Sequence, residues 1–269
     1  MTDRRRDPHP EKTTQREAAQ IGHAIVDLNR QPGGPRDRQL LLGDVVTVLN
    51  ESDDWCYIQA EKDGYCGYVI KAALVVADTP THMVMAPATH GYEEPDFKAT
   101  DRISLSFGSK LTVTHQSVKF AQTDFGYFPV QHLVPVAQPA LDPAAIVELF
   151  VGTPYLWGGN SRWGIDCSGL IQAACLACDI PCPGDSDQQE RDLGLALEND
   201  SSFERNDLLF WKGHVALVID SETLIHANSF AMSVCHEPIV GALARIASSD
   251  GPVTAHKRLP KSGHRTPKS

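Results

Sequence analysis

Gly152-Thr-Pro-Tyr-Leu-Trp-Gly-Gly-Asn-Ser-Arg-Trp-Gly-Ile-Asp-Cys-Ser-Gly-Leu170 is the stretch that decides how the chain is organised. A loop rich in glycine and aromatic residues ends at Asp166-Cys167, and an apolar run with helical character follows at once. A cysteine in the first turn of a helix feels partial positive charge there, which lowers the pKa of its thiol. The sequence therefore predicts a nucleophilic thiolate at Cys167, with a small buried residue as the alternative.

Bulk composition restricts the classes of function. The chain has 269 residues and a formal net charge of −10, which argues against nucleic acid as a main partner because no basic surplus exists to neutralise phosphates. The basic N-terminal stretch Met1–Pro10 is not followed by the apolar run of a secretory signal. No later apolar run reaches the length of a membrane-spanning helix. Seven cysteines, an odd number, do not read as a disulfide framework. We therefore expect a cytoplasmic protein with reduced thiols and no membrane partner; the oligomeric state stays open, with a monomer slightly favoured.

The N-terminal half has the pattern of short strands. Residues 1–20 are polar and charged and are predicted to form a disordered tail. After them, three apolar runs are separated by turn-like residues: Val45–Leu49, Trp55–Gln59 and Tyr65–Ile70.

The same pattern occurs twice. Gly43–Val48 resembles Gly108–Val113, and Gly67–Val75 aligns without gaps on Gly126–Val134. This recurrence predicts a duplicated β unit, each copy a small barrel that closes its own sheet edges. We place the two units at residues 21–78 and 79–137.

The C-terminal half, residues 138–260, has the pattern of an α+β domain, followed by a loose tail at 261–269. Asp142 and Pro143 predict an N-cap and a first helical residue, with the helix running to Gly152. A buried helix is expected over 168–177 and a short one from Asp185. Strands are expected at 208–211, 214–219, 224–227 and 233–237.

A nucleophilic cysteine needs a base, and the base needs a group that orients it. Among eleven histidines, His214 opens one predicted strand and His226 lies on the next. With an odd-length loop at 220–222, Ile219 pairs with Thr223 and the two histidines share a face, one diagonal step apart. A loop of even length would place them on opposite faces.

Four motifs in this order are similar to those of the NlpC/p60 family of papain-like cysteine peptidases: 154–159, 166–170, 213–216 and 225–227. The duplicated β units resemble the bacterial SH3-like (SH3b) domains that accompany this catalytic domain. The resemblance implies an α+β papain-like fold in which Cys167 is the nucleophile, His214 the base and His226 the orienting group. It also implies that the Tyr155 hydroxyl helps the Cys167 N–H to hold the oxyanion.

The segment Pro183–Gln188 is similar to one in γ-D-glutamyl-L-diamino-acid endopeptidases, which cleave murein stem peptides that carry a free N-terminal L-alanine. The resemblance implies a small murein stem peptide as the partner. It also implies a set of residues around the substrate, with one end of the cleft closed so that a free amine is required. These residues are Asp166, Asp185, Ser186, Tyr65 and Trp157.

Simpler roles remain open for several of these residues. Asp166 and Asp185 would also suit helix N-caps, and Trp157 would suit ordinary packing. Gly184 departs from the arginine common in relatives, which leaves open how its loop is braced.

No cofactor or metal is expected. Cys175, Cys178 and Cys182 are interpreted as buried structural thiols rather than a metal site. Two other functions stay open: a binding module for wall fragments that has lost catalysis, and an acyl or amide transferase on the same fold.

Overall fold

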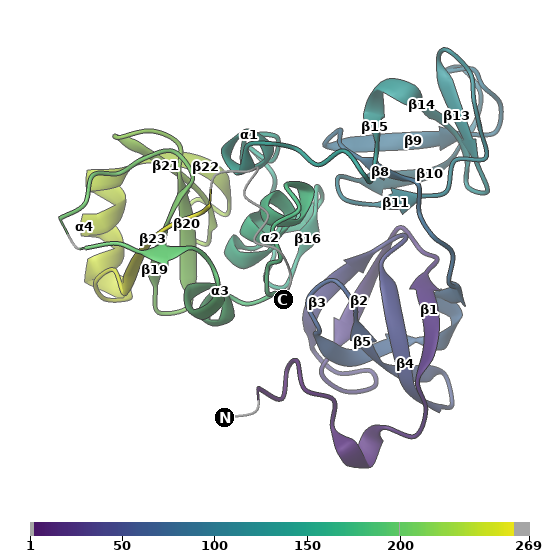
Figure 1. The fold of residues 1–269 in the computed structure, drawn as a ribbon, viewed down its shortest axis with the longest axis horizontal. Helices are drawn as coiled ribbons and strands as arrows, with labels where there is room; N and C mark the ends of the chain where they lie inside the picture. Colours follow the sequence, from purple (N-terminus) through teal and green to yellow (C-terminus); the bar gives the residue numbers. More distant parts are fainter. Residues whose placement is uncertain (1–2, 199, 261–269) are drawn as a thin grey trace. The chain divides into compact units, whose positions relative to one another are not determined.

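The computed structural model describes residues 3–198 and 200–260. The chain divides into two compact units (Figure 1). The first comprises the chain up to Gln138 together with Gly158–Trp163, and the second comprises Pro139–Trp157 together with the chain from Gly164.

The first unit begins with a seven-stranded antiparallel sheet in the order β3-β2-β6-β5-β4-β1-β7. Its elements are β1 (Glu17–Ile21), β2 (Ile25–Asn29), β3 (Arg36–Leu41), β4 (Val45–Ser52), β5 (Trp55–Ala60), β6 (Cys66–Ile70) and β7 (Leu74–Val76), with 3-10 turns η1 (Pro10–Lys12) and η2 (Lys71–Ala73). The three strands expected at 45–49, 55–59 and 65–70 correspond to β4, β5 and β6.

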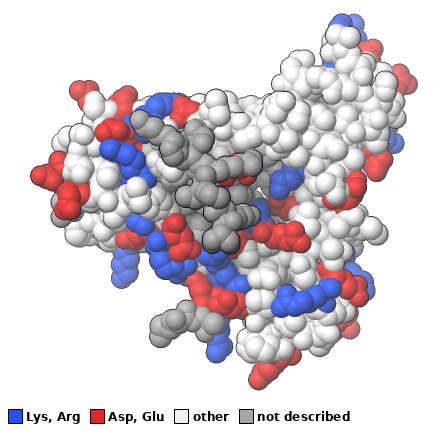
Figure 2. Space-filling view, in the orientation of Figure 1, with Lys and Arg blue, Asp and Glu red and all other residues white. Residues whose placement is uncertain are grey.

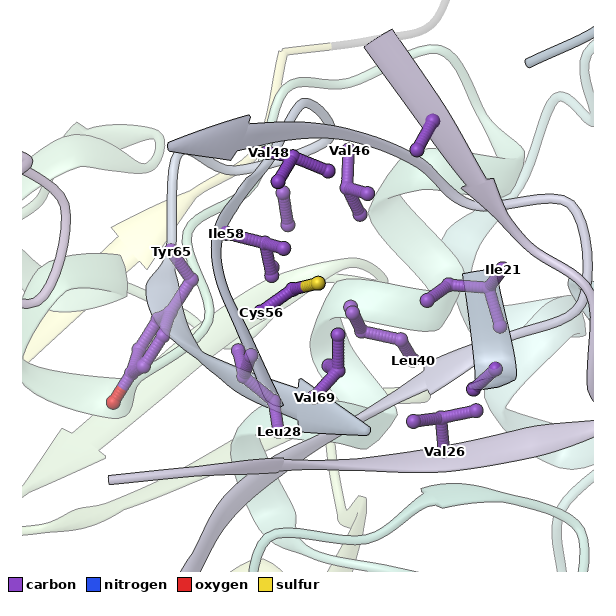
Figure 3. Packing of buried hydrophobic residues seen from close by; sticks show 13 residues of the cluster. Ile21, Val26, Leu28, Leu40, Val46, Val48, Cys56, Ile58, Tyr65 and Val69 are labelled. Atoms are coloured by element: carbon purple, nitrogen blue, oxygen red, sulfur yellow. The ribbon is translucent and has the colours of Figure 1, made fainter. Parts of the chain in front are cut away.

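Alternating side chains of these strands form one apolar core (Figure 3). Leu28 from β2, Val46 from β4 and Ile58 from β5 have no exposed surface. Each such side chain contributes about 1.5–3 kcal/mol when it leaves water, so this cluster closes the barrel.

The predicted disordered tail is wrong for the described residues 3–20. The Arg5 carbonyl accepts from the Cys66 N–H at 2.7 Å, and the Arg6 side chain donates to the Asp63 carbonyl at 2.9 Å. Strand β1 pairs with β4 and β7. The polar composition predicted disorder because much of what holds this segment is backbone hydrogen bonding, which the side-chain types do not reveal.

A second barrel follows within the same unit, built from a five-stranded sheet in the order β10-β9-β14-β13-β12 and a three-stranded sheet in the order β11-β8-β15. Its elements are β8 (His82–Val84), β9 (Ala88–Tyr92), β10 (Asp101–Ser106), β11 (Lys110–Leu111), β12 (His115–Gln116), β13 (Phe120–Thr123), β14 (Gly126–Pro129), η3 (Val130–His132) and β15 (Leu133–Pro135). The boundaries 78/79 and 137/138 stay predictions.

The two barrels repeat the same local structures, as the sequence repeat predicts. The succession β6-η2-β7 recurs as β14-η3-β15. Gly43 and Gly108, the matching glycines of the other repeat, have φ angles of +84° and +85°. Both sit in the left-handed region that side chains disfavour, which explains why glycine occupies both positions.

The second unit is an α+β domain with a six-stranded sheet in the order β18-β23-β19-β20-β21-β22. Its sheet strands are β18 (Leu195–Ala196), β19 (Asp207–Trp211), β20 (His214–Val218), β21 (Thr223–Asn228), β22 (Ser233–Pro238) and β23 (Ala255–Arg258). Its helices are α1 (Pro143–Glu148), α2 (Cys167–Ala177), α3 (Ser186–Asp192) and α4 (Ile239–Ser249). The loop before α2 holds two short strands, β16 (Asn160–Ser161), which falls in the first unit, and β17 (Gly164–Ile165).

Most elements of this domain agree with the sequence expectations. Helix α1 begins as predicted, with Asp142 accepting from the Ala144 N–H, but it ends at Glu148 rather than continuing to Gly152. Helix α4 and strand β23 were not predicted. Helix α4 packs on the sheet through Ile239, Ala242 and Ile246. The tail predicted at 261–269 lies outside the described residues.

Charged side chains of both signs are interspersed on the face in Figure 2. This arrangement is typical of a solvated polar surface. Among the described residues, no helix combines the length and the apolar character that crossing a membrane requires.

Replacing Gly43 with alanine is expected to destabilise the chain more than replacing Gly33. Both glycines have positive φ, but a Cβ at Gly43 would press on the Lys110 carbonyl, whereas a Cβ at Gly33 meets nothing within 4 Å. We expect a loss of about 1–2 kcal/mol in unfolding free energy for Gly33→Ala and a larger loss for Gly43→Ala. Urea denaturation of both variants measures the difference, and equal losses would contradict this packing.

Candidate active site

Cys167 is the first residue of α2, and its place follows from the residue before it. Asp166 has an extended backbone, with φ −98° and ψ 178°, and its carboxylate accepts from the Gly169 N–H at 2.6 Å and the Ser168 hydroxyl at 3.0 Å. An N-cap of this kind fixes where a helix begins. Asp166 therefore acts as a cap, one of its two expected roles, and sets Cys167 at the helix N-terminus.

The pKa of the Cys167 thiol is opposite to the sequence expectation. Burial, reinforced by the negative charge of Asp166, raises the pKa of Cys167 to about 12. The backbone N–H groups of Val215, Ser168 and Cys167 act in the lowering direction on this pKa but do not outweigh burial. The prediction of a pKa lowered by the helix terminus is therefore wrong, because Cys167 is only 7% exposed and burial disfavours the charged thiolate.

The Val215 N–H that donates to the Cys167 sulfur belongs to the residue that follows His214 on β20. A two-residue turn with Gly213 at φ +78° joins β19 to β20 and pairs Trp211 with His214. His214 therefore opens the strand beside the N-terminus of α2, as the sequence predicts.

The register between β20 and β21 is confirmed. Leu217 pairs with Ile225, and the Ile219 N–H donates to the Thr223 carbonyl at 2.9 Å. This is the odd-length loop that places the two histidines on one face. His214 Nε2 lies 2.8 Å from His226 Nδ1, with ring centroids 5.0 Å apart.

Two further residues extend this run of hydrogen bonds, and the sequence analysis missed both. His226 Nε2 lies 3.0 Å from Glu237 Oε2. Arg245 holds the same carboxylate, with Nε 2.9 Å from Oε1 and Nη2 2.6 Å from Oε2. His226 pairs with Cys235 across β21 and β22, so Glu237, two residues on, shares the face of His226. The alternation of side chains along the predicted strand could have identified Glu237. Arg245 could not have been identified, because helix α4 was not predicted.

The run of hydrogen bonds assigns the ring protons. Hydrogen bonding and charge from Arg245 hold the pKa of Glu237 below its usual range, so the carboxylate is ionised and can only accept. His226 Nε2–H then donates to Glu237, and His226 Nδ1 accepts from His214 Nε2–H. Nδ1 of His214 is left with a lone pair.

Both histidines are neutral at pH 7. Burial, together with the adjacent His226, lowers the pKa of His214 to about 3. Burial also lowers the pKa of His226 to about 4, although Glu237 acts in the raising direction. A thiolate on Cys167 alone or a positive charge on His214 alone is therefore disfavoured in this site.

Tyr155 is fixed by its backbone, close enough to Cys167 for the two side chains to interact electrostatically. Its N–H donates to the Met232 carbonyl at 2.9 Å, and it forms a parallel bridge with Ile165. Burial and the charges of Cys167 and Asp166 raise the pKa of Tyr155 to about 12, so the phenol keeps its proton and can donate it in a hydrogen bond. Trp157, two residues on, is 58% exposed, which does not support core packing as its role.

The segment around Asp185 and Ser186 is braced by Gln189. Gln189 Nε2 donates to the Ser168 carbonyl at 2.9 Å and to the Pro183 carbonyl at 3.0 Å. Asp185 occupies the N-cap position of α3, but its side chain makes no capping hydrogen bond. The capping role expected as the alternative for Asp185 is therefore not supported. Gln189 therefore holds the loop that contains Gly184, which answers how this loop is braced.

Tyr65 belongs to the first unit, where it is 4% exposed and its ring centroid lies 5.9 Å from the Arg38 guanidinium carbon. Figure 3 shows its hydroxyl directed away from the apolar cluster. A place for Tyr65 beside the substrate stays a prediction.

Within residues 3–198 and 200–260, no group of three or more His, Cys, Asp or Glu side chains is placed to hold a metal ion. Cys175, Cys178 and Cys182 are buried free thiols.

Comparison with known proteins agrees with these motifs. The family model described as NlpC/P60 matches residues 152–242, and the one described as bacterial dipeptidyl-peptidase Sh3 domain matches residues 28–74. The chain is 30% identical over 231 residues to a γ-D-glutamyl-L-lysine dipeptidyl-peptidase of Bacillus subtilis (strain 168), covering 73% of each protein. The chain belongs to the NlpC/P60 family.

Two further proteins are similar to this chain over most of its length. A dipeptidyl-peptidase 6 of Lysinibacillus sphaericus is 28% identical over 218 residues, covering 71% of this chain and 79% of that protein. The crystal structure of an NlpC/P60 family protein from Bacillus cereus ATCC 10987 matches with a TM-score of 0.75 at 22% identity, covering 91% of this chain and all of that one. The predicted α+β fold, an NlpC/P60 domain preceded by SH3-like units, is confirmed.

Removing the donors of Gln189 is expected to destabilise the domain. Gln189→Leu keeps the approximate volume but leaves the carbonyls of Ser168 and Pro183 without this donor, which costs about 1–3 kcal/mol. Glu190→Gln, at the adjacent position, should change the unfolding free energy by less than about 0.5 kcal/mol. Urea denaturation of the two variants compares them, and indistinguishable midpoints would show that the brace is not needed.

Proposed function

We propose that the protein is a cysteine peptidase that hydrolyses the γ-D-glutamyl–diamino-acid bond of murein stem peptides with a free N-terminal L-alanine. One observation carries the proposal: Cys167 begins a helix beside the strand that presents His214, and His214 is hydrogen-bonded to His226. A nucleophile, a base and an orienting group in this order are the parts that acyl transfer requires. The substrate class is supported by relatives named dipeptidyl-peptidases.

The reaction begins with proton transfer. Nδ1 of His214 takes the proton from Cys167 Sγ as the sulfur attacks the carbonyl carbon of γ-D-glutamate. The negative oxygen of the tetrahedral intermediate accepts hydrogen bonds from the Tyr155 hydroxyl and the Cys167 N–H. His214 then gives its proton to the departing amine, which leaves a thioester on Cys167. Water, deprotonated by His214, hydrolyses the thioester and releases L-alanyl-γ-D-glutamate and the free thiol.

Specificity for a free amine is proposed to come from carboxylates close to the nucleophile. Asp166 and Asp185 would attract the terminal ammonium, and Ser186 would accept a hydrogen bond from it. Tyr65 and Trp157 would supply ring surfaces around the stem peptide. A closed end would leave no room for a preceding residue, so only peptides with a free N-terminus would be accepted.

We also propose that the enzyme acts inside the cell on released murein peptides that are being recycled. Seven cysteines, all free in the described structure, suit a reducing compartment.

The direct experiment compares L-Ala-γ-D-Glu-L-Lys with its N-acetylated form, using Cys167→Ala as the inactive control. We expect the free tripeptide to be cleaved and the acetylated one to be cleaved at least about 100-fold more slowly in kcat/KM, since a buried carboxylate would lose its ionic partner. Equal turnover would exclude recognition of the free amine, and no turnover of either would exclude the peptidase.

The same assay distinguishes the peptidase from the two alternative functions, a binding module and a transferase. Binding without cleavage by the wild-type chain would indicate a binding module. Product that forms only when an amine acceptor is added would indicate a transferase.

Tyr155→Phe tests the oxyanion role. Loss of one donor to the developing oxyanion should lower kcat by about 10²–10³-fold with little change in KM. Steady-state kinetics on the free tripeptide measure this, and thermal denaturation checks that the fold persists. A variant with wild-type kcat would remove Tyr155 from the oxyanion site.

A further inference from the structure

We propose that Glu237 is a positioning residue that acts through His226 to keep Nδ1 of His214 unprotonated and facing the nucleophile, and that Arg245 holds Glu237 for this task. The inference rests on the proposed use of Cys167 as nucleophile and His214 as base, but not on the identity of the peptide.

The geometry forms an unbroken line of polar contacts from strand to helix. His214 opens β20, His226 lies on β21, Glu237 on β22 and Arg245 on α4, with successive contacts of 2.8, 3.0 and 2.6 Å. His226 has no exposed surface, so its two ring nitrogens must find their partners inside the protein. The two partners are His214 on one side and Glu237 on the other.

Whether residue 237 can donate a hydrogen bond or only accept one determines which ring nitrogen of each histidine carries the proton. A carboxylate held by a guanidinium has only acceptor sites, whereas an amide in its place has both a donor and an acceptor. With an acceptor at Glu237, His226 must carry its proton on Nε2, and His214 must therefore carry its own on Nε2. With a donor there, both rings could take the other tautomer, and Nδ1 of His214 could no longer accept the thiol proton.

Glu237 also stabilises the positive charge that His214 acquires during the reaction. Besides Cys167, the proposed proton donor, the charged and titratable groups that act on His214 are His226, Arg245, Asp250 and Glu237. The two carboxylates favour the charged ring, and His226 and Arg245 oppose it. Of the two carboxylates, Glu237 is the one hydrogen-bonded to the line. Removing its charge should therefore make His214 harder to protonate.

Arg245 supplies the rigidity of the arrangement. Its planar fork makes two hydrogen bonds to the two oxygens of Glu237, and its guanidinium carbon lies 4.6 Å from the centroid of the Phe230 ring. A lysine ammonium is a point donor without this geometry, so it would leave the carboxylate freer to rotate.

The test substitutes Glu237→Gln in the full chain. In serine peptidases the equivalent exchange of a carboxylate bonded directly to the base costs about 10⁴-fold in kcat, and one histidine further away we expect a loss of about 10–100-fold, with KM little changed. The acid limb of the kcat/KM profile should move to lower pH, because loss of the negative charge lowers the pKa of the histidine pair. A merely structural role would not move this limb.

The matched control is Glu148→Gln. Glu148 Oε1 lies 2.9 Å from His236 Nε2, a glutamate–histidine contact of the same domain that is exposed and does not touch His226. This variant should keep wild-type kcat and pH profile. Glu237→Gln should also add little to the loss already caused by His226→Ala, because Glu237 acts through that ring.

A second readout does not depend on any substrate. The rate of alkylation of Cys167 by iodoacetamide at pH 7, followed by mass spectrometry of its peptide, should fall about tenfold in Glu237→Gln, as expected for a shift of about one pKa unit in the pair. If the wild-type chain cleaves no murein peptide but this rate still falls, the proposed substrate fails and the inference stands. Alkylation and pH profiles equal to those of Glu148→Gln would overturn it.

Arg245→Lys keeps the test decisive if Glu237→Gln does not fold. It retains the positive charge and the carboxylate, and should reduce the alkylation rate by a smaller factor than the tenfold above. A wild-type rate in this variant would overturn the role of Arg245.

Discussion

The hydrogen bond between His226 and an ionised carboxylate is the constraint on which the rest of the site depends. Glu237 can only accept, so it fixes the proton of His226, and His226 in turn fixes the proton of His214. His214, the proposed base, therefore depends on Glu237, which lies on a different strand and is linked to it through His226. Helix α4 contributes as well, because Arg245 keeps the carboxylate ionised and oriented.

The fold builds this line from ordinary elements. A two-residue turn at Lys212-Gly213 and an odd loop at 220–222 set the registers, and the pleat then puts His214 and His226 on one face. That face also carries Ala216, Val218 and Leu224, which pack on α4. The same packing that stabilises the domain thus brings Arg245 to the carboxylate. On the other side of the reaction centre, Asp166 begins α2 at Cys167.

The site keeps its charges neutral until the reaction requires them. Burial raises the pKa of Cys167 and lowers those of both histidines, so a lone thiolate or a lone imidazolium is disfavoured. In the proposed mechanism, proton transfer from sulfur to His214 creates both charges together, where each stabilises the other. In that mechanism the helix terminus and the Val215 N–H would stabilise the thiolate as it forms, rather than holding it in the resting state.

Local signals were enough to predict much of this molecule. Asp142-Pro143 and Asp166-Cys167 mark helix starts, and the repeated glycines at 43 and 108 mark equivalent turns. These features could be predicted because each depends only on residues close by in the sequence. The residues that sequence reasoning missed depend on partners far along the chain. Residues 3–20 are ordered by contacts with strands β4, β6 and β7, and the place of Arg245 depends on where α4 packs. The direction in which the pKa of Cys167 shifts depends on burial, which the sequence of the loop before it does not reveal.

The most direct measurement is nitrogen-15 NMR of the histidine side chains in the free protein at pH 7. The account predicts that Nδ1 of His214 and Nδ1 of His226 both show the shift of an unprotonated ring nitrogen, with both Nε2 atoms protonated. Protonated Nδ1 on His214 would contradict it, since that ring could not then accept the proton of Cys167.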